Sequence, residues 1–405
     1  MNIYIDKLIS FLILIGITLF LIVPKGGLVI LAILFLSIIG LYLKNDFKKK
    51  LENWEKFFLI SFISYFLIIT LNNFYFQGNI RDIDTESRFI LVIPIYMYLR
   101  KSNVDFKFIE FAIILASFVY GMISILPAFF GISHSLFQFA KHTGIVSLYG
   151  ATLGVTSLFL LNNNKTIFHN SIILIAALLG LATSIIGGGR GVWIAAFLSF
   201  ITLFYFNPLR QKNLERTLVI FVISLVVLMG YLLPQTNVKL RTDLAKNELV
   251  NFVENHATGT SIGARLEMWK SSFLISKDNL IFGIGEGNFK EKNNELIKED
   301  LIHKDVSRFN HPHNEYLTTL VEQGLLGLIF LIFLFSNILS TCFSNFRKNL
   351  DTNILTPLIF ASSITLHYIF YSLSNGVFDH QNTTLFFVSY ISIALGVFAS
   401  RRANS

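Results

Sequence analysis

Three short segments of the chain carry side chains that could bind an anion or move a proton. The first is Gly187-Gly-Gly-Arg190-Gly191, between two apolar stretches. The glycines allow a tight backbone turn, and Arg190 then opens the next helix, whose N-terminus offers free N–H groups and a positive dipole end. With the planar donor fork of arginine, this place suits a phosphate. The alternative is a structural arginine whose side chain extends to the membrane surface.

The second segment is Gly263-Ala-Arg265-Leu-Glu-Met-Trp269. Arg265 and Trp269 are four residues apart, so on a helix they share one face. We interpret the pair as an arginine held against an aromatic ring and aimed at an anion. A solvated surface arginine is the alternative.

The third segment is His311-Pro-His313-Asn314. A histidine is mostly neutral at physiological pH, because its ordinary pKa is about 6.5, and can act as a general base. With His303 nearby the pair could instead bind a metal, but no cysteine and no regular carboxylate spacing accompanies it. A purely structural pair is the other alternative. We predict no metal and no cofactor.

Further positions carry weaker signals. Asp82-Ile-Asp84 has the spacing with which some glycosyltransferases hold a divalent cation, but so short a pattern is common by chance. Arg88 could be a third anion contact, and the carboxylate of Asp379 could orient a cation or a substrate hydroxyl. Each is more simply explained as structural.

The composition places these segments in a membrane protein. Hydrophobic residues make up 53% of the 405 residues and charged residues only 14%, against about 25% charged in soluble domains. This excludes disorder, a coiled coil and a nucleic-acid-binding domain. The net charge of +8 is therefore no sign of nucleic acid, since basic residues also set membrane orientation. The single cysteine, Cys342, excludes an intrachain disulfide.

Apolar runs predict an all-α polytopic protein of about twelve transmembrane helices. We expect nine spans in residues 1–234, a large loop over residues 235–318, and three spans in residues 319–405. The twelve runs lie near 8–23, 27–43, 57–71, 88–100, 108–128, 145–161, 171–186, 192–206, 217–234, 319–342, 354–374 and 384–400.

The basic residues predict the orientation of these spans. With the N-terminus in the cytoplasm, the inside segments carry seventeen Lys and Arg and the short outside segments five. The remaining eleven lie in the loop at 235–318, and long loops cross the membrane largely regardless of charge. Both termini are therefore expected inside, with the large loop outside.

The large loop has the residues for a small helical cap. Several apolar side chains, Trp269 and Phe289 among them, could form its core. We expect a helix over 262–276 with Ser261 as its N-cap, broken from the next segment by the turn Gly283-Ile-Gly-Glu-Gly287. Because no strand precedes these glycines, a dinucleotide site is a poor interpretation.

These motifs resemble those of bacterial O-antigen ligases. His313-Asn314, nine residues, and then Gly324-x-x-Gly327 is similar to the H-N-x9-G-x-x-G signature of that family. Glu86-Ser-Arg88-Phe and Phe282-Gly-Ile-Gly also look like family segments, and the resemblance is most specific over 187–193, 263–269 and 311–327. The wider superfamily includes O-antigen polymerases and protein O-oligosaccharyltransferases. The chain ends at Ser405 without the long extension expected of the latter.

The resemblance implies a GT-C enzyme of the bacterial inner membrane that acts on the periplasmic face. It would move O-antigen polysaccharide from undecaprenyl diphosphate to lipid A–core, inverting the anomeric carbon. We expect His313 to be the base and Arg190 and Arg265 to neutralise the leaving diphosphate, which leaves a metal ion no obvious task. The expected partners are the lipid-linked polysaccharide, the lipid A–core acceptor and membrane lipids, and no nucleic acid. The expected substrate-binding residues are Arg88, Trp269, His311, Asn314 and Asp379.

Two other classes remain open. A polymerase or a protein O-oligosaccharyltransferase of the same superfamily differs in its acceptor. A transporter of lipid-linked glycans would also have many spans, but transporters more often have inverted repeats and polar groups near the membrane midplane. Here the ionisable groups gather at one membrane face, which favours chemistry at a surface.

Overall fold

The chain folds into helices around a hydrophobic bundle. The computed structural model describes residues 2–20, 22, 25–44, 50–81, 83–104, 106–130, 143–162, 165–206, 230–233, 238–348 and 352–402, and no strand occurs within these ranges. The helices are α1 (Asn2–Leu19), α2 (Leu28–Lys44), α3 (Asn53–Tyr75), α4 (Arg88–Leu91), α5 (Ile93–Leu99), α6 (Phe106–Phe130), α7 (Thr143–Leu158), α8 (Ile167–Gly187), α9 (Arg190–Phe206), α11 (Val238–Asn255), α12 (Ser261–Asp278), α13 (Phe289–Lys298), the 3₁₀ helix η3 (Lys304–Arg308), α14 (Glu315–Phe346), α15 (Thr352–Tyr371) and α16 (Gln381–Arg402).

The chain is an all-α polytopic membrane protein, as expected. Among the described helices, six are long and apolar enough to span a membrane, namely α3, α6, α8, α14, α15 and α16, while α2, α4–α5, α7 and α9 are shorter apolar helices. The run at 88–100 forms two short helices, α4 and α5, and Pro94 lies in the first turn of α5, where proline is tolerated. Most of the ninth expected span, 217–234, lies outside the described residues, so the number twelve stays a prediction.

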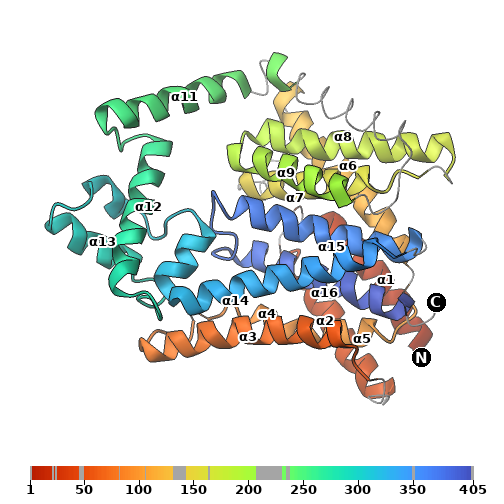
Figure 1. Cartoon of the computed structure of the whole chain (residues 1–405). Coiled ribbons are helices and arrows are strands. Elements are labelled where there is room, and N and C mark those ends of the chain that lie inside the picture. Colours follow the sequence, from red (N-terminus) through yellow and green to blue (C-terminus); the bar gives the residue numbers. More distant parts are fainter. Residues whose placement is uncertain are drawn as a thin grey trace.

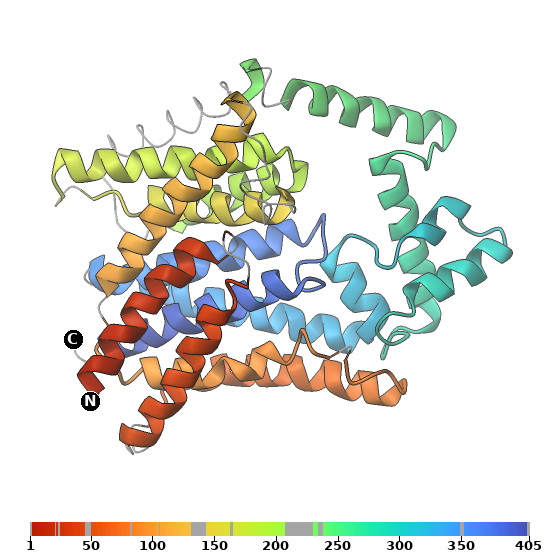
Figure 2. The ribbon, with the colours of Figure 1, turned by 180° about the vertical axis from the view of Figure 1, so that it is seen from behind.

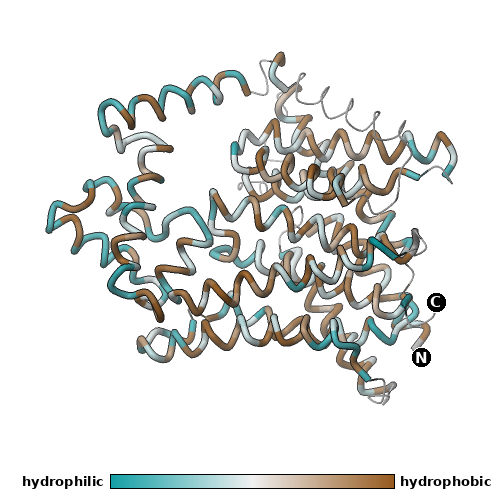
Figure 3. The backbone as a smooth tube through the Cα atoms, in the orientation of Figure 1, coloured by the Kyte–Doolittle hydropathy of each residue, from teal (hydrophilic) through white to brown (hydrophobic). Residues whose placement is uncertain are grey.

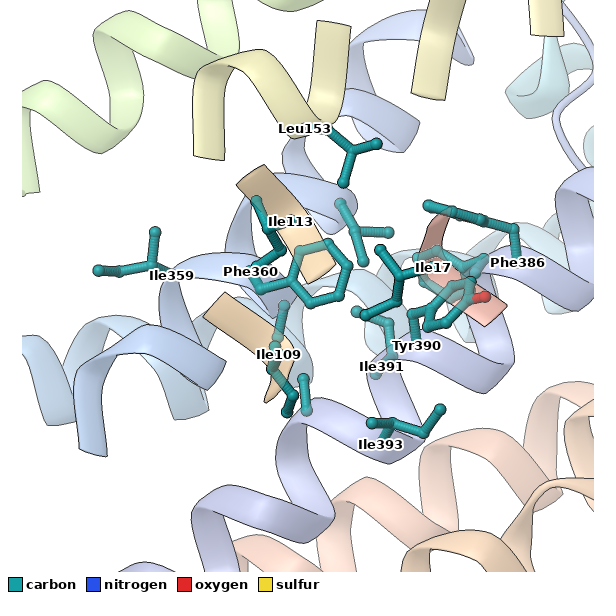
Figure 4. Packing of buried hydrophobic residues seen from close by; sticks show 14 of the residues in the cluster. Ile17, Ile109, Ile113, Leu153, Ile359, Phe360, Phe386, Tyr390, Ile391 and Ile393 are labelled. Atoms are coloured by element: carbon teal, nitrogen blue, oxygen red, sulfur yellow. The ribbon is translucent and has the colours of Figure 1, made fainter. Parts of the chain in front are cut away.

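Helices α15 and α16 form the centre of the bundle. The protein itself buries 89% of the apolar window of α15 and 94% of that of α16, against 33–39% for the other four long helices. In Figures 1 and 2 they lie between the α7–α9 group and the α2–α5 group. Figure 4 shows Phe360 and Tyr390 of these helices packed among side chains of α1, α6 and α7. The central pair therefore fixes both flanking groups.

Helices α11 to α13 form a polar module at one end of the bundle. Hydrophilic residues gather there, whereas the bundle helices are mostly hydrophobic (Figure 3), and both termini lie at the opposite end (Figure 1). The expected helix in this segment is α12, but its N-cap is Thr260 and not Ser261. Thr260 has extended backbone angles and its hydroxyl accepts the N–H of Gly263 at 3.0 Å, while Ser261 is already helical.

A buried ion pair joins α3 to the end of α5. Arg100 donates from Nε to Glu55 Oε1 at 2.6 Å and from a terminal nitrogen to Oε2 at 2.9 Å. Tyr96 adds a hydrogen bond to Oε1 at 2.8 Å. Both charged side chains are only 3% exposed, so neither can be solvated if its partner is removed.

We expect Glu55→Gln to destabilise the fold by about 3–5 kcal/mol, because it leaves the Arg100 charge buried and unpaired. Thermal unfolding of the purified protein in detergent measures the change. Lys56→Gln is the control, since Lys56 is exposed one residue away and surface changes usually stay within about 0.5 kcal/mol. Equal stability of the two variants would contradict the role given to the pair.

Candidate active site

The turn before α14 is held by contacts from α12 and from the segment that follows α15. Trp269 of α12 donates its indole N–H to the carbonyl of Pro312 at 3.2 Å. Asn314 is the N-cap of α14, because its Oδ1 accepts the N–H groups of Tyr316 at 3.0 Å and Leu317 at 3.2 Å. Its amide donates to the carbonyl of Leu373 at 3.2 Å. The amide of Asn314 is thus committed to holding the turn, as a cap.

His313 lies in a strained backbone position. Its φ of 52° is in the left-handed region, which costs a non-glycine residue about 1–3 kcal/mol and persists only where the surroundings impose it. Nδ1 of His313 lies 3.5 Å from Oδ1 of Asn375, at the long end for a hydrogen bond. Asn375 is oriented by donating to the hydroxyl of Tyr371 at 2.8 Å. With Nδ1–H facing Asn375, Nε2 is the nitrogen that can accept a proton.

His311 links this turn to the connection between α15 and α16. The two imidazole rings are 4.3 Å apart in a T-shaped arrangement, and Nδ1 of His311 lies 3.1 Å from Oδ2 of Asp379. A Cβ on Gly376 would collide with the Asp379 carboxylate, so only glycine leaves that carboxylate its place. The site therefore joins two connections that are distant in sequence.

Burial sets the protonation of this group. It lowers the pKa of His313, and the neighbouring His311 and, more weakly, Arg265 lower it further, while Asn375 and Asp379 act in the opposite direction. Burial also lowers the pKa of His311 and raises that of Asp379, where His380 and His313 act in the opposite direction. Both histidines are consequently neutral at pH 7, as a general base must be.

Arg190 and Arg265 lie near one another. One terminal nitrogen of Arg190 is 3.3 Å from Glu248 of α11, and the other is buried without a hydrogen-bond partner in the described part of the chain. Burial lowers the pKa of Arg265, and the charge of Arg190 lowers it further. Within the described ranges no carboxylate lies within ion-pair distance of Arg265. Two guanidinium groups are thus balanced there by the single carboxylate of Glu248. This leaves a net positive charge that could bind an anion.

Gly191 connects the arginines to the histidines. A Cβ at this position would collide with the hydroxyl of Ser374 and lie 3.4 Å from the ring of Tyr371. The start of α9 therefore packs directly on the end of α15. Because Tyr371 contacts Asn375, which faces His313, one short set of contacts runs from Arg190 to the candidate base.

One sequence-based expectation is corrected here. Trp269 does not stack on Arg265 among the described contacts, because its indole donates to Pro312 instead. Arg88 binds the carboxylate of Asp84 at 3.1 Å and lines a cavity separate from the arginine pair, so its role in substrate binding stays a prediction. Asp82 lies outside the described residues.

A pocket of buried carboxylates adjoins the histidines and was missed in the sequence. It is small, about 50 Å³, and Asp379 belongs to both it and the histidine group. Oε2 of Glu86 is buried without a hydrogen-bond partner among the described residues, and burial raises the pKa of Glu86, with Glu286 adding to the effect. No pair spacing could reveal the pocket, since its carboxylates are scattered along the chain: Glu86, Glu286, Glu315, Glu322 and Asp379.

The two glycine motifs build this pocket by docking on each other. Helix α14 is broken at Gly324, where φ is 69° and ψ is −166°. The freed carbonyls of Val321 and Glu322 accept the N–H groups of Ile284 at 2.8 Å and Gly285 at 2.9 Å. In return Leu325 donates to the carbonyl of Leu280 at 2.7 Å. The backbones meet so closely that a Cβ at Gly324 would collide with Ile281.

No metal-binding arrangement is found in the described ranges. No group of three or more His, Cys, Asp or Glu side chains there could hold a metal ion. His303 lies apart from the site, where its Nδ1 contacts the hydroxyl of Thr258 at 2.8 Å.

Comparison with known proteins identifies the family. Residues 175–332 match the family model described as O-antigen ligase. This match contains Arg190, Arg265 and the whole His313 to Gly327 segment. The chain is also 30% identical over 382 residues to an uncharacterized protein of Haemophilus influenzae strain Rd, covering 91% of this chain and 93% of that protein. The chain belongs to the O-antigen ligase family of membrane proteins.

Proposed function

We propose that this protein transfers O-antigen polysaccharide from undecaprenyl diphosphate to lipid A–core, on the periplasmic face of the bacterial inner membrane. The observation that supports this best is the pair of partly buried arginines, joined through Tyr371 and Asn375 to a neutral histidine. The two arginines can bind the negatively charged diphosphate, and the histidine can remove a proton from the attacking hydroxyl. A glycosyl transfer from a lipid diphosphate requires both.

In the proposed reaction a hydroxyl of the acceptor sugar attacks the anomeric carbon of the donor. Nε2 of His313 takes the hydroxyl proton as the new C–O bond forms, which is typically worth about 10²–10⁴-fold. The bond between the anomeric carbon and the diphosphate oxygen breaks, and Arg190 and Arg265 stabilise the charge that develops there. Attack opposite the leaving group inverts the anomeric carbon. The two guanidinium groups take the place of a metal ion.

The donor lipid would approach along α7, α8 and α9. A groove of about 160 Å³ lies there, and its lining is almost wholly apolar. Trp193, Phe197 and Phe200 of α9 contribute to it, and the same helix begins with Arg190. A polyprenyl chain in this groove would carry its diphosphate to the arginine pair.

The orientation of the proposed site rests on charge and on the position of the termini. Basic residues favour the segments predicted inside by seventeen to five, and both termini lie opposite α11–α13 (Figures 1 and 2). We therefore place the termini in the cytoplasm and the site in the periplasm.

Deletion of the gene in an O-antigen-producing source bacterium should leave lipid A–core without O-chain, and the intact gene should restore it. Gel electrophoresis of the lipopolysaccharide measures the outcome. Single repeats attached to the core would instead identify a polymerase, and unchanged lipopolysaccharide would contradict a role in its assembly.

Arg190→Ala and Arg265→Ala should each lower transfer by about 10²–10³-fold, because a donor to the developing charge is lost. Lysine should restore little, since it lacks the planar fork. Purified protein with added donor and acceptor provides the measurement, and excess chelator should leave the wild-type rate unchanged.

Two control variants separate this effect from damage to the fold. Glu248→Gln removes the partner of Arg190 but keeps the guanidinium, so it should retain most transfer. Arg81→Ala removes an exposed arginine at the same end of the bundle and should be neutral. Near-normal transfer by both site variants at normal protein levels would refute the arginine assignment.

His313→Ala and His313→Gln should bind the donor normally but transfer it about 10²–10⁴-fold more slowly. His303→Ala is the matched control, because His303 lies apart from the site and contacts Thr258. A variant in which only the acceptor KM rises while kcat holds would show that His313 binds the acceptor and is not the base.

The pH profile provides a second test of the same base. His313 acts when neutral, so transfer should fall as the pH drops through its pKa, which burial places below the ordinary value of about 6.5. His311→Gln removes a neighbour whose charge lowers this pKa. In this variant the acidic limb of the pH profile of transfer should therefore move to higher pH. An unchanged pH profile would argue against His313 as the titrating group.

A further inference from the structure

A second cavity lies on the other flank of the central helices. It measures about 330 Å³ and is lined by α2, by α4 and α5, and by the start of α16. Figures 1 and 2 show these elements on the side of α15 and α16 opposite α9, which carries Arg190. The cavity is thus separate from the arginine pair.

The mouth of this cavity is cationic. Arg88 donates to the backbone carbonyl of Asp84 at 2.9 Å and to its carboxylate at 3.1 Å. Gln381 donates to the same carboxylate oxygen, Oδ2, at 3.0 Å. Lys25 also lines the mouth, is exposed, and has no ion-pair partner within the described ranges. Two cations against one carboxylate leave a net positive charge where a ligand would enter.

Most of the remaining lining is apolar, with Ser87 and Asn382 as further polar members, and its outer leucines are not covered by protein. Leu28 is 57% exposed, Leu31 52% and Leu91 50%, and Leu34 and Ile95 continue the lining inward. A cationic mouth above an apolar trough matches a molecule with a phosphate at one end and an acyl chain at the other. A free phosphate would leave the trough unfilled, and a neutral lipid would leave Lys25 without a partner.

The mouth lies next to the candidate active site. Gln381 follows Asp379 by two residues, and Glu86 in the carboxylate pocket precedes Arg88 by two. A reaction between two membrane-anchored substrates needs a separate lipid-binding site for each. The apolar groove beside Arg190 is the site proposed above for the donor lipid. We infer that the Lys25–Arg88 cavity binds the phosphorylated, acylated anchor of the acceptor lipid. This inference rests on the proposed function.

Binding is tested on the full-length protein in phosphatidylcholine nanodiscs. Phosphatidic acid, which has one phosphate and two acyl chains but no sugar, is the probe, and native mass spectrometry counts the lipid retained. Lys25→Gln should weaken retention about fivefold, and Leu91→Trp should weaken it by filling the trough. Arg81→Gln and Leu71→Trp are matched controls, because both residues are exposed and neither lines the cavity.

Several results would overturn the site. Phosphatidylcholine retained as well as phosphatidic acid would remove the charge argument, and inorganic phosphate bound as tightly would indicate a simple ion site. An equal loss of phosphatidic acid in the control variants and the cavity variants would also contradict a lipid site in this cavity. None of these measurements needs glycan transfer, so their outcome is independent of whether the proposed function is correct.

Kinetics then test the acceptor assignment. In Lys25→Gln the KM for acceptor lipid should rise about fivefold, while kcat and the donor KM stay unchanged. Loss of phosphatidic acid binding with an unchanged acceptor KM would refute the acceptor as occupant. If wild-type protein transferred no glycan at all, the proposed function would fail instead, and lipid retention would still report on the cavity.

Discussion

The backbone pairing at Gly324 is the constraint on which the site depends. A helix of 32 residues would ordinarily satisfy its own hydrogen bonds, but α14 gives up part of its ladder there and pairs with residues 280–285. An unpaired backbone group within an apolar bundle is expensive, so the break persists only with the loop docked. That docking fixes α12 and α13 against the start of α14. The positions of Arg265, Trp269 and the His311–Asn314 turn all follow from it.

The site combines a pair of cations with a pocket of buried carboxylates, and both groups act on the histidines. Arg190 and Arg265 supply the positive charge, whereas burial raises the pKa of Glu86 and Asp379 and so favours their protonated forms in the pocket. Asp379 borders the histidines on the pocket side, and Arg265 influences His313 from the other. In the proposed reaction the two arginines would stabilise the departing diphosphate, while His313 would hold the proton taken from the acceptor.

Sequence patterns predicted the local features of this site and missed the distant ones. The apolar runs predicted an all-helical membrane protein, and the helix expected over 262–276 lies close to the observed bounds of α12, Ser261–Asp278, because helix signals act within a few residues of the helix itself. The expected contact of Trp269 with Arg265 was wrong, since helical spacing placed the two on one face but could not show that the Trp269 indole donates to Pro312 instead. The carboxylate pocket was not predicted, because its side chains are distant in sequence and come together only in the tertiary structure, where α14 is interrupted at Gly324. Asn375 carried no signal, as its role depends on the orientation given by Tyr371.

The connection between α15 and α16 is where the two sides of the molecule meet. Within residues 372–381, Ser374 packs against Gly191, the residue that follows Arg190, and Asn375 faces His313. Asp379 contacts His311, and Gln381 holds Asp84 at the second cavity. Because the connection is so short, each of these contacts constrains the backbone of the next. A displacement near Gln381 would therefore also move Asn375, so in the proposed function the acceptor cavity and the partner of His313 depend on the same ten residues.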